Sequence, residues 1–349
     1  MQATMFYGPE DIRWEHRPDP RIELPTDAVV RVVAACVCGS DLWGYRGFHP
    51  EGPPRPIGHE FVGVVEQIGR GVTTLKPGDF VVAPFVISDN TCVNCRNGIH
   101  TSCLHRQSWG GTDPDGRIND GGQGEYVRVP LADGTLVATP EPPADALIPG
   151  LLSLSDVMAT GHHAALSAGV GPGRSVVVVG DGAVGLCAVL ASVRLGAERV
   201  IACSTHLDRQ QVATKFGAGD IVAERGEDAA AVVRDLLANT GADCVLECVG
   251  TEGAMDQAMA TVRPGGRIGF VGVPLGGAQL HIGQMFARNI TVGGGGAPVR
   301  AYLEELLPEV LDGRLDPSPV FDLQLPMSQV AEAYRAMHER RSIKTLLWP

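Results

Sequence analysis

A glycine-rich turn between two apolar runs constrains this chain more than any other feature. From Ser175 to Ser204 the sequence reads SVVVVGDGAVGLCAVLASVRLGAERVIACS, which predicts a strand, a turn, a helix of small residues and a second strand. Because amide groups at a helix start bind phosphate, and glycines let the backbone approach it, this segment predicts a dinucleotide site. The residues predicted to form the turn and contact the phosphates are Gly180, Gly182, Ala183, Val184 and Gly185.

The end of the second strand indicates which dinucleotide binds. An Asp or Glu about 20 residues after the glycines would accept a hydrogen bond from the ribose 2'-hydroxyl of NAD. Ser204 stands there instead, and hydroxyl groups with a nearby arginine suit the 2'-phosphate of NADP. The residues predicted to contact that phosphate are Ser204, Thr205, His206 and Arg209. The alternatives are that these are ordinary loop residues, or that Asp208 supplies a carboxylate for NAD in a shifted register.

Length and composition exclude several classes of protein. A chain of 349 residues predicts about two domains. The net charge of −12, without a block of Lys or Arg, argues against nucleic acid or anionic lipid as a partner. The sequence has no run long enough to span a membrane and begins without a signal-peptide pattern, so we expect a cytoplasmic protein. The nine cysteines are then expected to be metal ligands, catalytic groups or buried side chains rather than disulfides.

The two halves of the chain differ in their pattern. The first contains short apolar or alternating runs separated by Gly and Pro, which predict a β barrel or sandwich: DAVVRVVAACV, EFVGVVEQIG, DFVVAPFVI and EYVRVP. From Leu151 onward, strands near 176–179, 199–203, 244–248 and 268–273 alternate with Ala-rich helical segments, which predicts an α/β domain with a parallel sheet. After GGGGAP, the segment AYLEELLPEVLDG predicts a helix, followed by a turn-rich tail.

Residues of metal-ligand type are scattered through the first half. Cys38 in CVCGSD, His59 in GHE and Asp156 in LSDVM could give the three protein ligands of a catalytic zinc, which keeps one position open. On this pattern alone, the alternative is a buried cysteine with a surface or capping histidine and aspartate.

A second group of cysteines is more specific. In SDNTCVNCRNGIHTSC, Cys92 and Cys95 are two residues apart and Cys103 follows an Asn-Gly turn, which is typical of a closed structural zinc site. Asp89 is the candidate fourth ligand, because a carboxylate oxygen also binds zinc. The alternative is a loop of reduced cysteines without metal.

Together these segments resemble the medium-chain, zinc-dependent alcohol dehydrogenase family. The motifs that carry the resemblance stand in the family's order and span nearly the whole chain: CGSD, PIGHEFVGVVEQIGRGVTTLKPGDFV, the cysteine lobe, GEYVRVP, ATG, GDGAVG, ECVG, GFVGVP and AYRAMHERRSIKTLL. The resemblance implies an N-terminal GroES-like β-barrel catalytic domain over residues 1–150, completed by residues 290–349. It implies a Rossmann domain with a doubly wound parallel sheet over residues 151–289.

The resemblance also implies the metal ligands. Cys38, His59 and Asp156 match the family's catalytic zinc ligands, and Glu60 matches an adjacent carboxylate that can exchange with water at the metal. Asp41 matches a residue that hydrogen-bonds the zinc-bound histidine. The family's structural lobe has four cysteines, and Asp89 stands where the first would be, so the zinc of this lobe stays an open question.

Further residues are assigned by the same resemblance. Ser40 matches the hydroxyl that begins a proton relay, with a capping serine as the alternative. Trp43 stands where many members continue the relay with histidine; we expect it to shape the substrate pocket. His49 is a nearby substitute for that histidine, although an exposed loop histidine is the alternative.

The nicotinamide end of the cofactor is assigned to a set of backbone positions: Cys248, Val249, Gly250, Val271, Gly272 and Val273. Arg300 matches a position near the pyrophosphate, with a surface arginine as the alternative. His162 and His163 are left out of the site, because adjacent residues of a helix face different directions.

The implied activity is that of a zinc-dependent oxidoreductase. It would transfer hydride between an alcohol or carbonyl substrate and NADP(H), favoured here, or NAD(H), with zinc acting as a Lewis acid on the substrate oxygen. The alternatives are a zinc-free quinone or enone reductase on the same fold and a nicotinamide-binding protein without turnover. Family analogy also favours a homodimer or homotetramer.

Overall fold

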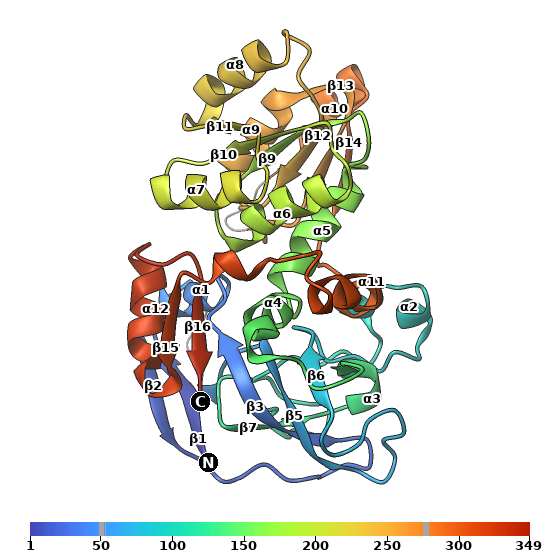
Figure 1. Ribbon diagram of the computed structural model, residues 1–349, viewed down its shortest axis with the longest axis vertical. Coiled ribbons are helices and arrows are strands. Elements are labelled where there is room, and N and C mark those ends of the chain that lie inside the picture. The colour runs from blue at the N-terminus through green and yellow to red at the C-terminus, as the bar shows by residue number, and fades with distance from the viewer. Residues whose placement is uncertain (49–51, 53, 275–278) are drawn as a thin grey trace. The chain divides into compact units, whose positions relative to one another are not determined.

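The computed structural model describes residues 1–48, 52, 54–274 and 279–349, and its internal contacts define two compact units. Unit 1 comprises Met1–Asp156 and Pro298–Pro349, and unit 2 comprises Val157–Ala297 (Figure 1). The final segment therefore belongs with the N-terminal half of the chain.

Unit 1 is built mainly of short strands. Its elements in chain order are β1 (Gln2–Gly8), β2 (Asp11–His16), β3 (Ala28–Cys36), α1 (Asp41–Tyr45), β4 (Arg55–Pro56), β5 (Phe61–Ile68), β6 (Phe80–Ala83), α2 (Val93–Arg96), η1 (His100–Ser102), β7 (Tyr126–Val129), α3 (Ala132–Thr135), β8 (Val137–Ala138), η2 (Asp145–Leu147), α4 (Ile148–Ser153), α11 (Val299–Leu311), η3 (Ser318–Val320), β15 (Leu323–Pro326), η4 (Met327–Gln329), α12 (Val330–His338) and β16 (Thr345–Trp348). The four runs predicted as strands in the first half are found as β3, β5, β6 and β7.

The strands of unit 1 form two sheets. The larger has the order β15-β16-β3-β5-β6-β8, with β7 also paired to β3, and the smaller has the order β2-β1-β4. Unit 1 extends past the expected boundary at residue 150 as far as Asp156, because α4 contacts β3, β5 and α11 of the same unit. All the candidate zinc ligands consequently lie in one unit.

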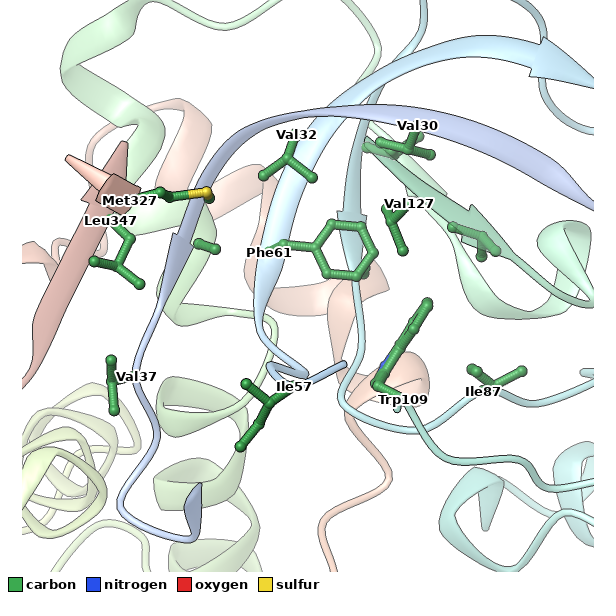
Figure 2. Packing of buried hydrophobic residues seen from close by; sticks show 14 of the residues in the cluster. Val30, Val32, Val37, Ile57, Phe61, Ile87, Trp109, Val127, Met327 and Leu347 are labelled. Carbon is green, nitrogen blue, oxygen red and sulfur yellow. The ribbon is translucent and has the colours of Figure 1, made fainter. Parts of the chain in front are cut away.

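The core of unit 1 joins the N-terminal and C-terminal segments of the chain. Figure 2 shows Phe61 of β5 against Trp109, whose ring centroid lies 5.0 Å away in an edge-to-face contact. Met327 and Leu347, from the final segment, belong to the same buried cluster. Full burial of a side chain of this size stabilises a fold by about 1.5–3 kcal/mol, so this packing holds the C-terminal strand beside β3.

Unit 2 is an α/β layer structure. Its elements are α5 (Val157–Ser167), β9 (Ser175–Val179), α6 (Ala183–Arg194), β10 (Arg199–Cys203), α7 (Leu207–Lys215), β11 (Asp220–Val222), α8 (Gly226–Leu236), β12 (Ala242–Glu247), α9 (Glu252–Thr261), β13 (Val262–Phe270), α10 (Ile282–Arg288) and β14 (Thr291–Gly294).

The sheet of unit 2 is parallel and has the order β11-β10-β9-β12-β13-β14. Helix α6 packs on α5, and α8 packs on α9, so helices cover the sheet (Figure 1). The strand order reverses between β9 and β12. In doubly wound sheets, ligands bind outside the carboxyl ends of the strands at such a switch point.

The structure contains elements that the sequence did not predict, among them β1, β2, β15 and β16. β11 and β14 were not predicted, because β11 has only three residues and β14 lies in a glycine run that lacks the side-chain alternation of a strand. The tail predicted as turn-rich contains α12, which buries Val330, Ala333 and Tyr334 along one face. Among the described residues, every helix is too short or too polar to cross a membrane.

Candidate metal centres and dinucleotide site

The first candidate metal centre lies where three segments of unit 1 meet. Cys38 follows β3, His59 and Glu60 directly precede β5, and Asp156 follows α4. One ligand atom from each of these four residues lies within 4.8 Å of those of the others. The fold therefore brings together residues that are more than a hundred positions apart in the sequence.

The distances between the donor atoms suit a tetrahedral metal ion. Cys38 Sγ lies 3.6 Å from Asp156 Oδ2, and His59 Nε2 lies 3.7 Å from the same oxygen. Zinc bonds of roughly 2.0–2.3 Å place tetrahedral ligand atoms roughly 3.3–3.8 Å apart. A thiolate, an imidazole and a carboxylate at this spacing match the donor set of a catalytic zinc.

A carboxylate on the opposite side orients His59. Asp41 Oδ1 lies 3.3 Å from His59 Nδ1, and Asp41 Oδ2 accepts a hydrogen bond of 3.0 Å from the amide of Cys38. Nε2 is thereby turned toward Asp156. Burial alone would lower the pKa of His59, but the charges of Asp41 and Cys38 raise it well above the usual value. The negatively charged groups around His59 thus stabilise positive charge at this position.

Glu60 is held by a buried lysine. Its Oε1 accepts a hydrogen bond of 2.7 Å from Lys344 Nζ, and its Oε2 accepts one of 3.3 Å from Cys36 Sγ. Both charged side chains are enclosed, with relative exposures of 0% for Glu60 and 1% for Lys344. Burial alone would lower the pKa of Lys344, but Cys36 and Glu60 raise it well above the usual value, which favours the ammonium form of Lys344. Lys344 was not predicted; a lysine inside the apolar run IKTLLW is the signal for it.

The predicted relay residues have mixed outcomes. Ser40 Oγ donates a hydrogen bond of 3.3 Å to Cys38 Sγ, so its hydroxyl lies beside a candidate ligand. Trp43 lies in α1, and its amide donates to the Ser40 carbonyl. His49 lies outside the described residues.

An aromatic side chain that the sequence did not single out lies next to the cluster. The ring of Phe85 meets His59 edge to face, with centroids 6.4 Å apart. The amide of Phe85 donates a hydrogen bond of 3.1 Å to the carbonyl of Ser155, the residue before Asp156. Phe85 therefore gives the cluster an apolar wall.

The second candidate metal centre is the cysteine lobe. Ligand atoms of Asp89, Cys92, Cys95 and Cys103 lie within 4.8 Å of one another. Asp89 Oδ1 accepts hydrogen bonds from the amide of Cys92, and Asp89 Oδ2 lies 2.5 Å from Nδ1 of His105, which the sequence did not indicate. A carboxylate ligand supported by a histidine is consistent with a closed zinc site.

Backbone amides of the lobe point at its sulfur atoms. Cys92 Sγ accepts from the amides of Cys95 and Leu104, at 3.5 and 3.4 Å. Cys103 Sγ accepts from the amides of Asp89 and His105, at 3.4 and 3.3 Å. Such donors stabilise thiolates, which is the form that binds zinc.

The thiols of the lobe should differ in reactivity when metal is removed. The amides of Cys95 and Leu104 lower the pKa of Cys92 to about 7, whereas burial raises the pKa of Cys95 and of Cys103. In chelator-treated protein, alkylation of Cys92 should therefore reach half its maximal rate near pH 7, while the other two react slowly. Pulsed alkylation with mass spectrometry measures this, and added zinc should protect all three. Reaction of Cys92 only in the ordinary thiol range would contradict the assignment.

The glycine turn of unit 2 has the geometry of a phosphate site. A side-chain carbon on Gly182 would meet no atom within 4 Å, so the backbone there is open to a ligand. One on Gly185 would lie 2.0 Å from the Gly180 carbonyl oxygen, so the helix packs closely on the turn. Gly182 is the N-cap of α6, which begins with Ala183 and Val184. The turn fits a pyrophosphate at the helix start.

The four residues predicted to contact a 2'-phosphate surround one carboxylate. Ser204, Thr205, His206 and Arg209 all hydrogen-bond to Asp181 of the glycine turn. Sequence reasoning missed Asp181, although it stands inside the turn motif. It also missed Arg225, which donates a hydrogen bond of 2.9 Å to Thr205 Oγ1. Asp208, the alternative carboxylate, is exposed in the first turn of α7.

The backbone assigned to nicotinamide lies at the carboxyl ends of β12 and β13. The amide of Cys248 donates to the Val179 carbonyl, directly before the glycine turn. Glu247 Oε1 accepts hydrogen bonds of 2.8 Å from the amides of Val249 and Gly250. In the adjacent strand the amides of Val271 and Gly272, which precede Val273, donate to the Glu247 carbonyl. These segments thus meet at the switch point of the sheet.

The remaining predicted residues are placed as follows. Arg300 lies in α11 of unit 1, with its Nε buried and, within the described part of the chain, without a hydrogen-bond partner. Burial lowers its pKa, and Arg300 in turn contributes to the lowered pKa of His100. His162 and His163 lie in α5 of unit 2, and neither belongs to the two metal-ligand clusters found among the described residues.

Comparison with known proteins gives matches along most of the chain. A family model described as the alcohol dehydrogenase GroES-like domain matches residues 24–141, and one described as zinc-binding dehydrogenase matches residues 183–312. The chain is similar to a probable zinc-binding alcohol dehydrogenase of Mycobacterium tuberculosis, with 34% identity over 97% of this chain and 86% of that protein.

The chain is also similar to a fungal protein and to a bacterial protein of known structure. A medium chain reductase/dehydrogenase of Acremonium is 38% identical over 78% of this chain and 93% of that protein. The structure of an alcohol dehydrogenase from a Thermus species superposes with a TM-score of 0.91, at 33% identity, and covers 100% of this chain and 99% of its own. The predicted fold class, a GroES-like domain with a Rossmann-type parallel sheet, is confirmed.

Proposed function

Because the chain belongs to the medium-chain, zinc-type alcohol dehydrogenase family, we propose that it is a zinc-dependent oxidoreductase that prefers NADP(H). It transfers hydride between an alcohol or carbonyl substrate and the nicotinamide. The observation that carries this proposal is the convergence of Cys38, His59 and Asp156 within the spacing of zinc ligands.

Each residue of the cluster then has a role. Cys38, His59 and Asp156 would hold the zinc, which when bound supplies a Lewis acid that polarises the substrate oxygen. Asp41 keeps Nε2 of His59 turned toward the metal position, as its contact with Nδ1 indicates. Ser40, beside Cys38, exchanges the proton of the substrate hydroxyl.

Glu60 is the carboxylate that can approach the metal position. Its Oε1 lies 4.0 Å from His59 Nε2 while bound to Lys344. Lys344 places an ammonium group against Glu60 in an enclosed site, where an unpaired carboxylate would be costly. We infer that Lys344 fixes the position of Glu60.

The walls near the cluster suit a substrate with an apolar part. Phe85 contacts the ring of His59, and Trp43 lies one helical turn after Ser40. Aromatic groups bind the carbon skeleton of a small alcohol or ketone, while the cluster takes its oxygen. A homodimer or homotetramer is proposed by family analogy alone.

The preference for NADP rests on Ser204, Arg209 and the residues around them, and a charge at Ser204 tests it. The Ser204→Asp variant places a second carboxylate beside Asp181, 2.9 Å from the present Oγ. It should raise KM for NADP at least about tenfold relative to KM for NAD, since a carboxylate repels a 2'-phosphate. Steady-state kinetics with both cofactors measure the change, and Ser204→Ala is the uncharged control. Undiminished use of NADP would show that Ser204 does not contact the phosphate.

The activity itself is tested with alcohols and the corresponding carbonyl compounds. Formation of reduced nicotinamide should require a primary or secondary alcohol and NADP, should cease after chelation of zinc, and should return when zinc is added. Reduction of an enone or quinone by the zinc-free protein would instead support the zinc-free reductase. Cofactor binding without turnover of any alcohol or carbonyl compound would contradict the enzymatic role.

A further inference from the structure

A carboxylate occupies the centre of the predicted 2'-phosphate pocket in unit 2. Asp181 lies in the glycine turn directly after β9, and its side chain reaches the end of β10. Asp181 Oδ2 accepts a hydrogen bond of 2.9 Å from Ser204 Oγ and lies 3.0 Å from His206 Nδ1. Asp181 Oδ1 accepts one of 3.1 Å from Arg209 Nη1. The side-chain donors that would bind a phosphate are therefore turned toward an internal anion.

This carboxylate is ionised. Burial alone would raise the pKa of Asp181, but the hydrogen bond from His206, the charge of Arg209 and the hydrogen bond from Ser204 hold it below the usual value. Asp181 is therefore a fixed negative charge, which repels a phosphate and can accept a hydrogen bond from a hydroxyl group.

The pocket also has donor capacity that Asp181 does not use. Arg209 Nε is buried and, among the described residues, has no hydrogen-bond partner. Arg225 Nη2 donates a hydrogen bond to Thr205 Oγ1, and the Arg225 side chain is exposed. The guanidinium groups of Arg209 and Arg225 outnumber the one carboxylate of Asp181, so the site keeps positive charge that can bind a phosphate. The carboxylate of Asp181 can in turn bind a ribose hydroxyl.

We propose that Asp181 gives this pocket two modes of recognition, so that the protein binds NAD(H) as well as NADP(H). Asp181 accepts a hydrogen bond from the ribose 2'-hydroxyl of NAD. Arg209, His206 and Arg225 bind the 2'-phosphate of NADP, which competes with Asp181 for Arg209 and His206. Asp181 thus sets the ratio of the two affinities. This inference rests on the proposed function, because it assumes that the glycine turn binds a nicotinamide dinucleotide.

The Asp181→Asn variant separates the two modes. It keeps the size of the side chain and removes its charge. The affinity for NADP should rise about tenfold, because the phosphate no longer competes with a carboxylate, and the affinity for NAD should fall severalfold. If Asp181 had a purely structural role, the variant would lower the affinity for both cofactors together. Opposite changes in the two affinities therefore indicate that Asp181 acts on cofactor recognition.

Arg209→Gln is a second test that removes a phosphate donor. The affinity for NADP should fall at least about tenfold, and the affinity for NAD should stay within about twofold of the native value. Asp208→Asn is the matched control for Asp181→Asn, since it removes the same negative charge from an exposed position two residues after His206. Its ratio of NADP to NAD affinity should equal that of the native protein.

The experiment titrates purified full-length protein with NADP+ and with NAD+ and follows protein fluorescence, so it does not depend on catalysis. Opposite shifts in Asp181→Asn and an unchanged ratio in Asp208→Asn support the proposal. If both cofactors bind but Asp181→Asn keeps the native ratio, the two-mode pocket is wrong while the proposed function stands. If Asp208→Asn loses affinity for NAD, then Asp208 rather than Asp181 binds the ribose hydroxyl, and the proposal is wrong. If the native protein binds neither cofactor, the proposed function and this inference both fail.

Discussion

Replacing Cys38 with alanine is expected to lower kcat/KM for alcohol oxidation by about a thousandfold or more. The variant removes one of the three donors whose atoms lie 3.6–3.7 Å from their neighbours in the candidate zinc site. Lewis-acid stabilisation by a metal contributes several kcal/mol to a transition state, and each ~1.36 kcal/mol corresponds to a factor of ten in rate. Steady-state kinetics in zinc-containing buffer measure the loss.

A buried cysteine outside the cluster is the matched control. Cys244 lies in β12 of unit 2, is also buried, and donates to the carbonyl of Ala168. Cys244→Ala removes the same group and should keep activity within about threefold, since it touches neither metal site nor substrate. Equal activity of the Cys38→Ala and native proteins would refute the zinc mechanism.

The second large effect is expected on stability. Lys344→Met leaves the fully buried carboxylate of Glu60 without its cation. Breaking a buried ion pair from one side typically costs about 3–5 kcal/mol, because the remaining charge stays desolvated. The urea midpoint of unfolding of unit 1 should therefore fall strongly, which circular dichroism and the fluorescence of its four tryptophans can follow.

Two further variants separate this cause from general disruption. In the double variant Lys344→Met with Glu60→Gln, neither position carries a buried charge, so part of the lost stability should return. Arg31→Ala breaks the exposed ion pair with Glu66 and should cost less than about 1 kcal/mol. An unfolding midpoint of Lys344→Met equal to that of the native protein would show that the pair does not stabilise the fold.

Much of the fold followed from local patterns in the sequence. Alternating apolar residues between Gly and Pro clusters located β3, β5, β6 and β7, and the glycine turn located the β9–α6 junction. The spacing of Cys92 and Cys95 predicted the lobe without help from the rest of the chain. These signals are strong because each motif forms its site within a short stretch of chain.

The residues that were missed act across long sequence distances or lack a pattern. Lys344 and Glu60 are 284 positions apart in the sequence, and no local periodicity predicts a contact between them. Asp181 was hidden inside a motif whose glycines alone were interpreted, although its side chain reaches the strand end where an acidic residue was sought. β14 was not predicted, because its glycines show no alternation of side chains.

The same limit applied to the catalytic ligands. Cys38, His59 and Asp156 are ordinary residues in three separate segments, and their spacing in sequence favoured core or surface positions as readily as a metal site. Family resemblance proposed the set, and the fold brings their donor atoms together. Chemistry that depends on tertiary contact is therefore recoverable from one sequence only through such a resemblance.

The central claim is that the Cys38 cluster holds zinc, and zinc per chain measured by elemental analysis tests it most directly. Native protein purified without chelators should contain close to two zinc ions per chain, one for each ligand cluster. Cys38→Ala should contain one, and so should Cys95→Ala, each having lost the ion of its own site. Native protein without zinc, or a Cys38→Ala variant with the native content, would contradict the account.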